Sequence, residues 1–233
     1  MPATIYLIPT VLAEGATGCL PSYILDAVKK CNVFFVENER TARRYLKLLW
    51  KEMVIDDKEW YNMSEVNAQV TGAFNQKIRE EKTIGIISEA GCPGVADPGQ
   101  ALVQIAQEKN ILVKPLVGPN SILLALMASG MNGQHFQFLG YLPIDIAERT
   151  KALKNLEAES KQKGCTQIFI ETPYRNNQML ETILKTCTPQ TRLCVAADIT
   201  GGEETIQTRT VQQWKAAVPQ LHKRPVIFLL HST

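Results

Sequence analysis

The run Ile84-Gly-Ile-Ile87 leads directly into Ser88-Glu-Ala-Gly-Cys-Pro-Gly-Val-Ala-Asp-Pro-Gly99. A short apolar run that is followed by glycines and prolines predicts a buried strand and then a constrained loop. Asp97 occupies the position expected of a helix N-cap, and Pro98 that of the first helical residue. Apolar residues at helical spacing follow, at Ala101, Leu102, Ile105 and Ala106. The stretch therefore predicts a strand, a glycine-rich turn and the start of a helix.

A glycine-rich turn of this kind has two interpretations. In an open α/β sheet small ligands bind beyond the carboxyl ends of the strands, and glycines let a ligand approach the backbone. The same residues can also form a tight, well-capped connection without any ligand. Two known phosphate-binding loops are excluded, because the sequence lacks the Gly-Lys-Ser/Thr ending of a Walker loop and the Gly-x-Gly-x-x-Gly spacing of a dinucleotide fingerprint.

Five segments resemble, in the same order, motifs of one known family. Glu89-Ala-Gly-Cys-Pro-Gly-Val-Ala-Asp-Pro-Gly99 resembles the Asp-Ala-Gly-Thr-Pro-Gly-Ile-Ser-Asp-Pro-Gly signature of the tetrapyrrole methylase superfamily, in the branch that 2′-O-methylates a ribose of 16S ribosomal RNA. Leu116-Val-Gly-Pro-Asn-Ser121 resembles that branch's Pro-Gly-Pro-Ser, and Ala128-Ser-Gly-Met131 its Ala-Ser-Gly-Leu. The segment from Phe136 to Pro143 resembles Phe-x-Phe-x-Gly-Phe-Leu-Pro, and Glu171-Thr-Pro-Tyr-Arg175 resembles Glu-Ser-Pro-His-Arg.

The resemblance implies an S-adenosylmethionine-dependent methyltransferase. Its two α/β domains would bind the cofactor in the cleft between them, usually within a homodimer, and its partner would be ribosomal RNA or the small ribosomal subunit. Glycines and small residues would offer backbone groups to the nucleoside and the methionine tail, and apolar walls would shield the sulfonium. The cofactor-contacting positions carried over from the family are Pro9, Ser88, Ala90, Gly91, Gly94, Val95, Ala96, Asp97, Ser121 and Leu142.

The composition is that of a globular protein without a strong charge bias. The 233 residues are 45% hydrophobic and carry a formal net charge of +2, which neither requires nor excludes a nucleic-acid partner. The six cysteines form no Cys-x-x-Cys pair, and no histidine lies at metal-ligand spacing. We therefore expect reduced thiols and no bound metal. Because no signal peptide precedes the first strand and no apolar run approaches ~20 residues, we expect a soluble, cytoplasmic protein.

The first half, residues 1–116, predicts an α/β domain with a mostly parallel sheet. Strands that alternate with helices pair in parallel, since each return to the sheet needs a crossover. The expected strands are 5–8, 33–36, 83–87 and 111–115, and the expected helices between them are 21–28, 40–51 and 66–78, with a further helix after the glycine-rich loop. The segment Val117-Gly-Pro119 is the expected joint to a second domain.

The second half, residues 117–233, predicts an α/β domain with a mixed sheet. Four apolar strands are expected, and a fifth segment, 205–210, alternates as a two-faced antiparallel strand does. The apolar strands are 136–139, 167–171, 193–198 and 226–230. Helices are expected from Ser121, around Met179 and Ile183, and over 149–163, which is polar enough to predict a largely exposed helix.

A group of basic residues follows the second predicted strand. Four-residue steps place them on one side of the expected helix. A solvated charged face is the ordinary interpretation of such a pattern, and a patch for RNA phosphates is the functional one. The residues are Arg40, Arg43, Arg44, Lys47 and Lys51.

Glu171 and Arg175 are the candidate catalytic residues. Methyl transfer depends mostly on how the acceptor is oriented, yet a ribose hydroxyl is a poor nucleophile and gains from a nearby base or hydrogen-bond acceptor. Glu171 ends an apolar strand, where it is placed to take that role or to orient Arg175. The alternative is a structural ion pair across a turn.

The chain departs from the ribosomal branch where RNA contacts are expected. The family's Gly-Asn-Leu-Gly-Asp loop is replaced by Ala13-Glu-Gly-Ala-Thr-Gly18, and its Arg-Glu-Leu-Thr-Lys segment by Ala197-Asp-Ile-Thr-Gly201. The basic cluster that usually follows Phe-Leu-Pro is absent, and the first basic residue there is Arg149. Each lost phosphate contact weakens RNA binding. We therefore weigh three hypotheses: a ribosomal RNA ribose methyltransferase, which the ordered motifs favour, a methyltransferase of a small tetrapyrrole-like molecule, and a non-catalytic cofactor-binding protein.

Overall fold

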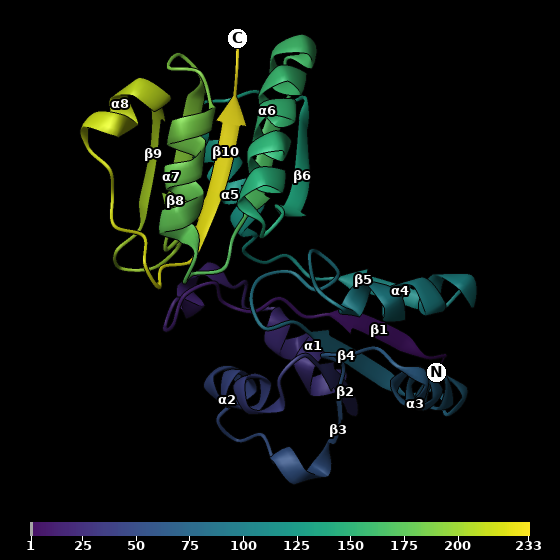
Figure 1. Cartoon of the computed structure of the whole chain (residues 1–233). Coiled ribbons are helices and arrows are strands. Elements are labelled where there is room, and N and C mark those ends of the chain that lie inside the picture. The colour runs from purple at the N-terminus through teal and green to yellow at the C-terminus, as the bar shows by residue number, and fades with distance from the viewer. Residues whose placement is uncertain (1) are drawn as a thin grey trace. The chain divides into compact units, whose positions relative to one another are not determined.

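The computed structural model describes residues 2–233 and divides into two compact units, of which the second runs from Ser121 to Thr233 (Figure 1). Each unit has its own five-stranded sheet and its own apolar core. The predicted pair of α/β domains is therefore confirmed. The predicted boundary after residue 116 lies just before the point at which the chain enters the second unit.

The sheet of the first unit is parallel throughout, with the strand order β3-β2-β4-β1-β5. Its strands are β1 (Thr4–Leu7), β2 (Val33–Val36), β3 (Glu59–Asn62), β4 (Thr83–Ile87) and β5 (Leu112–Pro115). Its helices are α1 (Ile24–Lys30), α2 (Glu39–Leu49), α3 (Ala68–Arg79) and α4 (Gly99–Glu108), with short 3-10 turns at Thr17–Cys19 and Ile55–Asp57.

Both faces of this sheet are buried, which explains why its central strands are continuous apolar runs. Successive residues of a strand point to opposite faces. Phe34 packs in a cluster with residues of α1 and α2, whereas Phe35 packs in a second cluster with residues of α3 and α4. Gly85 belongs to this packing, because a Cβ atom at that position would lie 2.7 Å from the Phe34 ring.

Strands β1 and β4 are neighbours at the centre of the sheet, but the chain leaves them in opposite directions. From β1 it passes through α1 to β2, and from β4 it passes through α4 to β5. Strands β2 and β5 lie on opposite sides of the β4-β1 pair within the sheet. Neighbouring parallel strands whose connections diverge in this way leave a crevice beyond their carboxyl ends. The loops after β1 and β4 therefore border the expected ligand site of this unit.

Most predicted elements of the first unit are present, with bounds that shift by a few residues. Strand β3 was not predicted; it is an edge strand whose Trp60 stacks on Phe34, with ring centroids 5.0 Å apart. The helix predicted over 40–51 ends at Leu49, so Lys51 lies beyond it, which corrects the prediction that all five basic residues lie on one helix.

The second unit has a mixed sheet, as predicted, and its strand order is β6-β7-β10-β8-β9. Strands β6 and β7 pair in parallel, and the remaining neighbours pair antiparallel. The strands are β6 (Phe136–Tyr141), β7 (Thr166–Ile170), β8 (Arg192–Ala197), β9 (Thr205–Thr210) and β10 (Val226–His231). The helices are α5 (Ser121–Ser129), α6 (Ile146–Lys163), α7 (Asn176–Thr186) and α8 (Val211–Ala216).

Helix α6 is less exposed than its polar sequence predicts. It begins at Ile146 and buries Arg149, Leu153, Leu156 and Ser160. These positions lie three or four residues apart, so they form one stripe along the helix. Leu153 and Leu156 join the core, in which Phe169 of β7 stacks on Phe228 of β10. The prediction of a largely exposed helix was therefore wrong for this stripe.

A helix that crosses a bilayer needs about 20 consecutive, mostly apolar residues. Within residues 2–233, no helix is long and apolar enough to cross a bilayer.

Candidate functional site

The loop after β4 is held in shape by Asp97. Its Oδ2 atom accepts a hydrogen bond from the Gly94 amide and its Oδ1 atom one from the Gly99 amide, both over 2.7 Å. Gly91 and Gly94 have φ values of 74° and 85°, a region that favours glycine. Helix α4 begins at Gly99 with Pro98 at its N-cap position, so the predicted helix start is one residue too early, but Asp97 still accepts a hydrogen bond from the first helical amide.

The charge of Asp97 is balanced by its surroundings. Burial raises the pKa of this carboxyl above its ordinary value and the charge of Glu37 adds to the rise, whereas the amides of Gly99, Gly94 and Val95 oppose it. Backbone amides of the same loop thus stabilise the charged form of this half-buried carboxyl. The loop conformation and the protonation state of Asp97 therefore depend on each other.

The loop is joined to the end of β1. The Thr10 amide donates to the Gly91 oxygen over 2.8 Å. Tyr45 donates its hydroxyl to the Pro9 oxygen over 2.5 Å, and a Cβ atom at Gly118 would lie only 2.2 Å from the Cβ atom of Pro9. Pro9 is therefore fixed beside the glycine-rich loop, and its part in cofactor binding stays a prediction.

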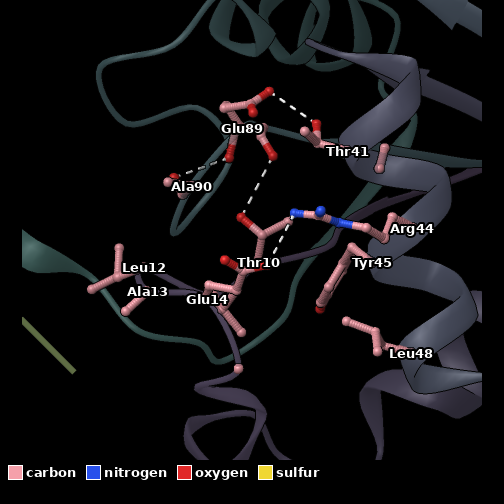
Figure 2. A pocket seen from close by; sticks show the side chains of 14 residues that line it. Thr10, Leu12, Ala13, Glu14, Thr41, Arg44, Tyr45, Leu48, Glu89 and Ala90 are labelled. Atoms are coloured by element: carbon pink, nitrogen blue, oxygen red, sulfur yellow. Dashed lines mark hydrogen bonds and ion pairs between the residues drawn. The ribbon is translucent and has the colours of Figure 1, made fainter. Parts of the chain in front are cut away.

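A pocket of about 220 Å³ lies beside this loop (Figure 2). Its walls come from the segments that follow three strands of the parallel sheet, β1, β2 and β4. Hydroxyl groups and carboxylates share it with small apolar side chains. The lining residues are Thr10, Val11, Leu12, Ala13, Glu14, Gly15, Thr41, Ala42, Arg44, Tyr45, Leu48, Ser88, Glu89 and Ala90.

Glu89 is the carboxylate of this pocket whose position is fixed by hydrogen bonds. Thr41 donates its hydroxyl to Glu89 Oε2 over 3.0 Å (Figure 2). The Glu89 amide donates to Glu37 Oε2 over 2.8 Å. These hydrogen bonds hold Glu89 in place. Because Glu89 is exposed, its carboxylate is still accessible to a ligand.

The basic face of α2 is only partly available for a ligand. Arg43 pairs with Glu39 over 2.9 Å and lies 5.0 Å above the Trp60 ring. Lys47 donates to the backbone oxygens of Lys51 and Met53, so it closes the end of the helix. Arg44 lines the pocket and pairs weakly with Glu14 over 3.6 Å, with both side chains exposed.

Four of the predicted site residues belong to the second unit. Ser121 is the first residue of α5, and Leu142 is buried in the core of this unit. Arg175 donates to Glu171 Oε1 from Nε over 3.0 Å and from Nη2 over 2.6 Å, and the Thr172 amide donates to the same oxygen over 2.7 Å. The other oxygen, Oε2, is buried and has no hydrogen-bond partner among the described residues. The structural ion pair weighed from the sequence is thus present.

Thr41, Tyr45 and the hydrogen bond between Glu37 and Glu89 were not singled out from the sequence. The available signal was that Glu37 directly follows a buried strand, because such positions meet at one edge of a parallel sheet. Across residues 2–233, no cluster of three His, Cys, Asp or Glu side chains is arranged to hold a metal ion.

Most of the chain matches the model of one protein family. The family model described as Tetrapyrrole (Corrin/Porphyrin) Methylases matches residues 15–214. The chain belongs to this family. The family and the enzyme class predicted from the sequence, a methyltransferase, are thereby confirmed.

The curated relatives that this methylase resembles include proteins named Ribosomal RNA small subunit methyltransferase I. The protein of Vibrio cholerae is 27% identical over 97% of this chain and 76% of its own length, and that of Escherichia coli O157:H7 is 28% identical over 94% and 73%. The protein of Micromonospora olivasterospora is 31% identical over 76% of this chain and 53% of its own length.

Solved structures agree with the fold. The methyltransferase CobJ matches this methylase with a TM-score of 0.64 at 15% identity, over 99% of this chain and 93% of its own. The uroporphyrin-III-C-methyltransferase of Thermus thermophilus has a TM-score of 0.58 at 16% identity, with the same shares covered. At this level of identity the likeness concerns the fold alone.

Proposed function

We propose that this methylase transfers the methyl group of S-adenosylmethionine to a ribose 2′-hydroxyl of small-subunit ribosomal RNA. The observation that carries the proposal is the loop from Ser88 to Asp97, which lies beside a pocket at the carboxyl ends of β1, β2 and β4. The names of the curated relatives support the choice of RNA as acceptor.

The residues of the loop fit the cofactor. A Cβ atom at Gly94 would meet no atom within 4 Å, so open space adjoins this backbone. Ala90, Val95 and Ala96 are exposed and supply small apolar surfaces. When bound, the cofactor supplies a methyl group activated by a sulfonium. We propose that Pro9 and the predicted residues of the loop hold it, and that Ser121 and Leu142 of the second unit keep their predicted part in binding.

The pocket would orient the acceptor. A ribose hydroxyl gains from a hydrogen-bond acceptor that fixes its direction of attack. Glu89 suits this role better than Glu171, because it is exposed and held by Thr41, whereas the side chain of Glu171 has no accessible surface and its Oε1 atom already accepts three hydrogen bonds. Glu171 and Arg175 remain the second pair of candidates.

Homodimeric assembly and action in the cytoplasm complete the proposal. Exposed apolar side chains on and after β6 support a partner surface, because large apolar patches on a protein surface often mark interfaces. Tyr141 is 61% exposed, and Ile144 and Ile146 are each 68% exposed. Sedimentation of the purified protein tests the assembly.

The acceptor is tested with radiolabelled S-adenosylmethionine and small ribosomal subunits that lack the modification. Methylation of a 2′-hydroxyl blocks alkaline cleavage of the neighbouring phosphodiester, so the label should appear in alkali-resistant dinucleotides. Label found on bases, or transferred to a tetrapyrrole and not to RNA, would overturn the proposal.

The role of Glu89 is tested in the same assay. Glu89→Gln should lower the turnover rate by about 10² to 10⁴ while leaving cofactor binding unchanged. Glu65→Gln, an exposed position outside this pocket, is the matched control. Full turnover by Glu89→Gln would return the role to Glu171.

A further inference from the structure

Helix α6 carries a buried arginine for which the described residues supply no counter-ion. Arg149 is 2% exposed, and its Nε atom is buried without a hydrogen-bond partner. The guanidinium makes one long hydrogen bond, from Nη1 to the Ile144 oxygen over 3.4 Å. Within residues 2–233 it forms no ion pair with a carboxylate. A buried cation without compensation costs folding free energy.

The position of Arg149 within the helix makes this arrangement more unfavourable. Helix α6 begins at Ile146, so Arg149 lies in its first turns. The N-terminal end of a helix carries a partial positive charge, which repels a cation and attracts an anion. An anion bound beside the guanidinium would compensate the buried charge of Arg149, and the N-terminal end of the helix would attract that anion.

Arg149 lines a groove that has room for such an anion. The groove has a volume of about 540 Å³ and is lined by residues of α6 and α7. These two helices pack against each other (Figure 1). Lys154 adds a positive charge that has no ion-pair partner within residues 2–233, and Thr150 adds a hydroxyl. The other lining residues are Ile146, Gln178, Glu181, Thr182, Lys185 and Thr186.

The charges of the groove leave a positive excess. Glu181 is the one carboxylate among the described lining residues, and it pairs with Lys185. With three cations, Arg149, Lys154 and Lys185, against this one carboxylate, the lining keeps an excess of two positive charges for a ligand. The planar fork of a guanidinium matches the oxygens of a phosphate, with which it forms two parallel hydrogen bonds.

We propose that this groove binds a phosphate group, with Arg149 as the principal donor and Lys154 and Lys185 as supporting charges. The phosphate belongs either to an RNA backbone or to a free phosphorylated molecule. In the RNA case the inference rests on the proposed function, whereas the phosphate site itself does not.

Inorganic phosphate is the first probe, and thermal unfolding of the full chain is the readout. Phosphate should raise the melting temperature of the wild-type protein more than a chloride salt of equal ionic strength does. Arg149→Met keeps the apolar stem and removes the charge, so it should weaken phosphate binding by about 10- to 100-fold. In phosphate-free buffer the same variant should be at least as stable as the wild type, because it removes an uncompensated charge.

A structural role for Arg149 gives the opposite result. Lower stability of Arg149→Met in phosphate-free buffer, or an equal effect of phosphate on both proteins, would overturn the proposal.

A second pair of variants separates the two sources of phosphate and avoids the buried position. Lys154→Gln with Lys185→Gln changes two exposed residues of the groove, and Lys151→Gln with Lys161→Gln removes two exposed lysines of α6 that do not line it. If RNA is the source, the groove pair should lower the salt dependence of oligoribonucleotide binding by about one to two contacts, and the control pair should not. An unchanged salt dependence together with Arg149-dependent phosphate binding assigns the site to a free phosphorylated molecule.

The test of the proposed function is separate. A protein that methylates RNA but shows no Arg149-dependent binding of phosphate would overturn this inference alone.

Discussion

Arg175 donates two hydrogen bonds to a single carboxylate oxygen of Glu171, from Nε over 3.0 Å and from Nη2 over 2.6 Å. The Glu171 side chain has no accessible surface, whereas that of Arg175 keeps 27%. The buried carboxylate therefore depends on the arginine more than the arginine depends on the carboxylate, since solvent can replace only the partner that is exposed.

Removing the arginine is the sharper of the two possible substitutions. Arg175→Gln should lower the free energy of unfolding by about 3 kcal/mol, because it leaves Glu171 buried with one backbone donor. Urea unfolding measures the loss, and Arg79→Gln, at an exposed position without an ion pair among the described residues, controls for the change in charge. If the pair is structural, the turnover rate per folded molecule should stay unchanged. A tenfold lower rate in the folded variant would restore the catalytic interpretation.

The hydroxyl of Tyr45 satisfies the Pro9 oxygen inside the first unit. Tyr45 is 6% exposed, so Tyr45→Phe leaves a buried carbonyl without this donor and should cost about 1 to 2 kcal/mol of stability. Because Pro9 is a proposed cofactor contact, calorimetry should also find weaker binding of S-adenosylmethionine. Tyr174→Phe is the control, since Tyr174 is 69% exposed and should change neither quantity. Equal effects of the two substitutions would contradict the role of this hydrogen bond.

The elements that were predicted correctly are those whose signal is local. Strands β2 and β4 are apolar runs, and the loop after β4 contains the carboxylate that holds it in shape, Asp97. The pocket beside the loop has no such signal. Thr10, Thr41 and Glu89 follow three different strands, and they meet only because β4 inserts between β1 and β2. Strand order is a property of the whole sheet, which hydrophobic periodicity does not encode.

The failures of the sequence prediction share a different cause. In α6 the buried stripe begins with Arg149, a residue type that is almost always exposed, so the sequence predicts a solvated helix. In β3 the segment Glu59–Asn62 is short, polar at both ends and placed at a sheet edge, where one neighbouring strand is enough to hold it. Both features depend on what packs against the segment and not on its own composition.

A substitution at Gly94 tests the cofactor site. It has two expected effects, backbone strain and a methyl group that occupies space proposed for the cofactor. Its φ of 85° disfavours any side chain, and an added Cβ atom would meet nothing within 4 Å of the protein. Gly94→Ala should therefore cost about 1 to 2 kcal/mol of stability through strain and also weaken cofactor binding, because the methyl group occupies the proposed site.

The matched control for Gly94 is Gly164→Ala at the end of α6. Gly164 also has a positive φ, of 59°, and also has open space around an added Cβ atom. It should lose stability to a similar degree and bind S-adenosylmethionine as the wild type does in calorimetry. Weakened cofactor binding by both variants would point to a loss of stability as the common cause.

His231 should make the stability of this methylase depend on pH. His231 is 7% exposed at the end of β10, with Nδ1 3.3 Å from the Thr166 hydroxyl. Burial lowers the pKa of this imidazole below its ordinary value of 6.5, and the charge of Arg192 lowers it further. The unfolded chain therefore takes up a proton at a higher pH than the folded protein does, so stability is lost as the pH falls below about 6.5.

His231→Gln should remove this part of the acid sensitivity. Between neutral pH and about pH 5, the melting temperature of the wild type should fall by a few degrees more than that of the variant. The comparison uses the slope with pH and not the absolute stability, so a general weakening of the core by the substitution does not obscure it. His222→Gln, at an exposed position, should keep the wild-type slope. Parallel pH profiles for the wild type and His231→Gln would show that the acid sensitivity comes from other groups, because a side chain that does not change its proton binding on unfolding contributes no slope.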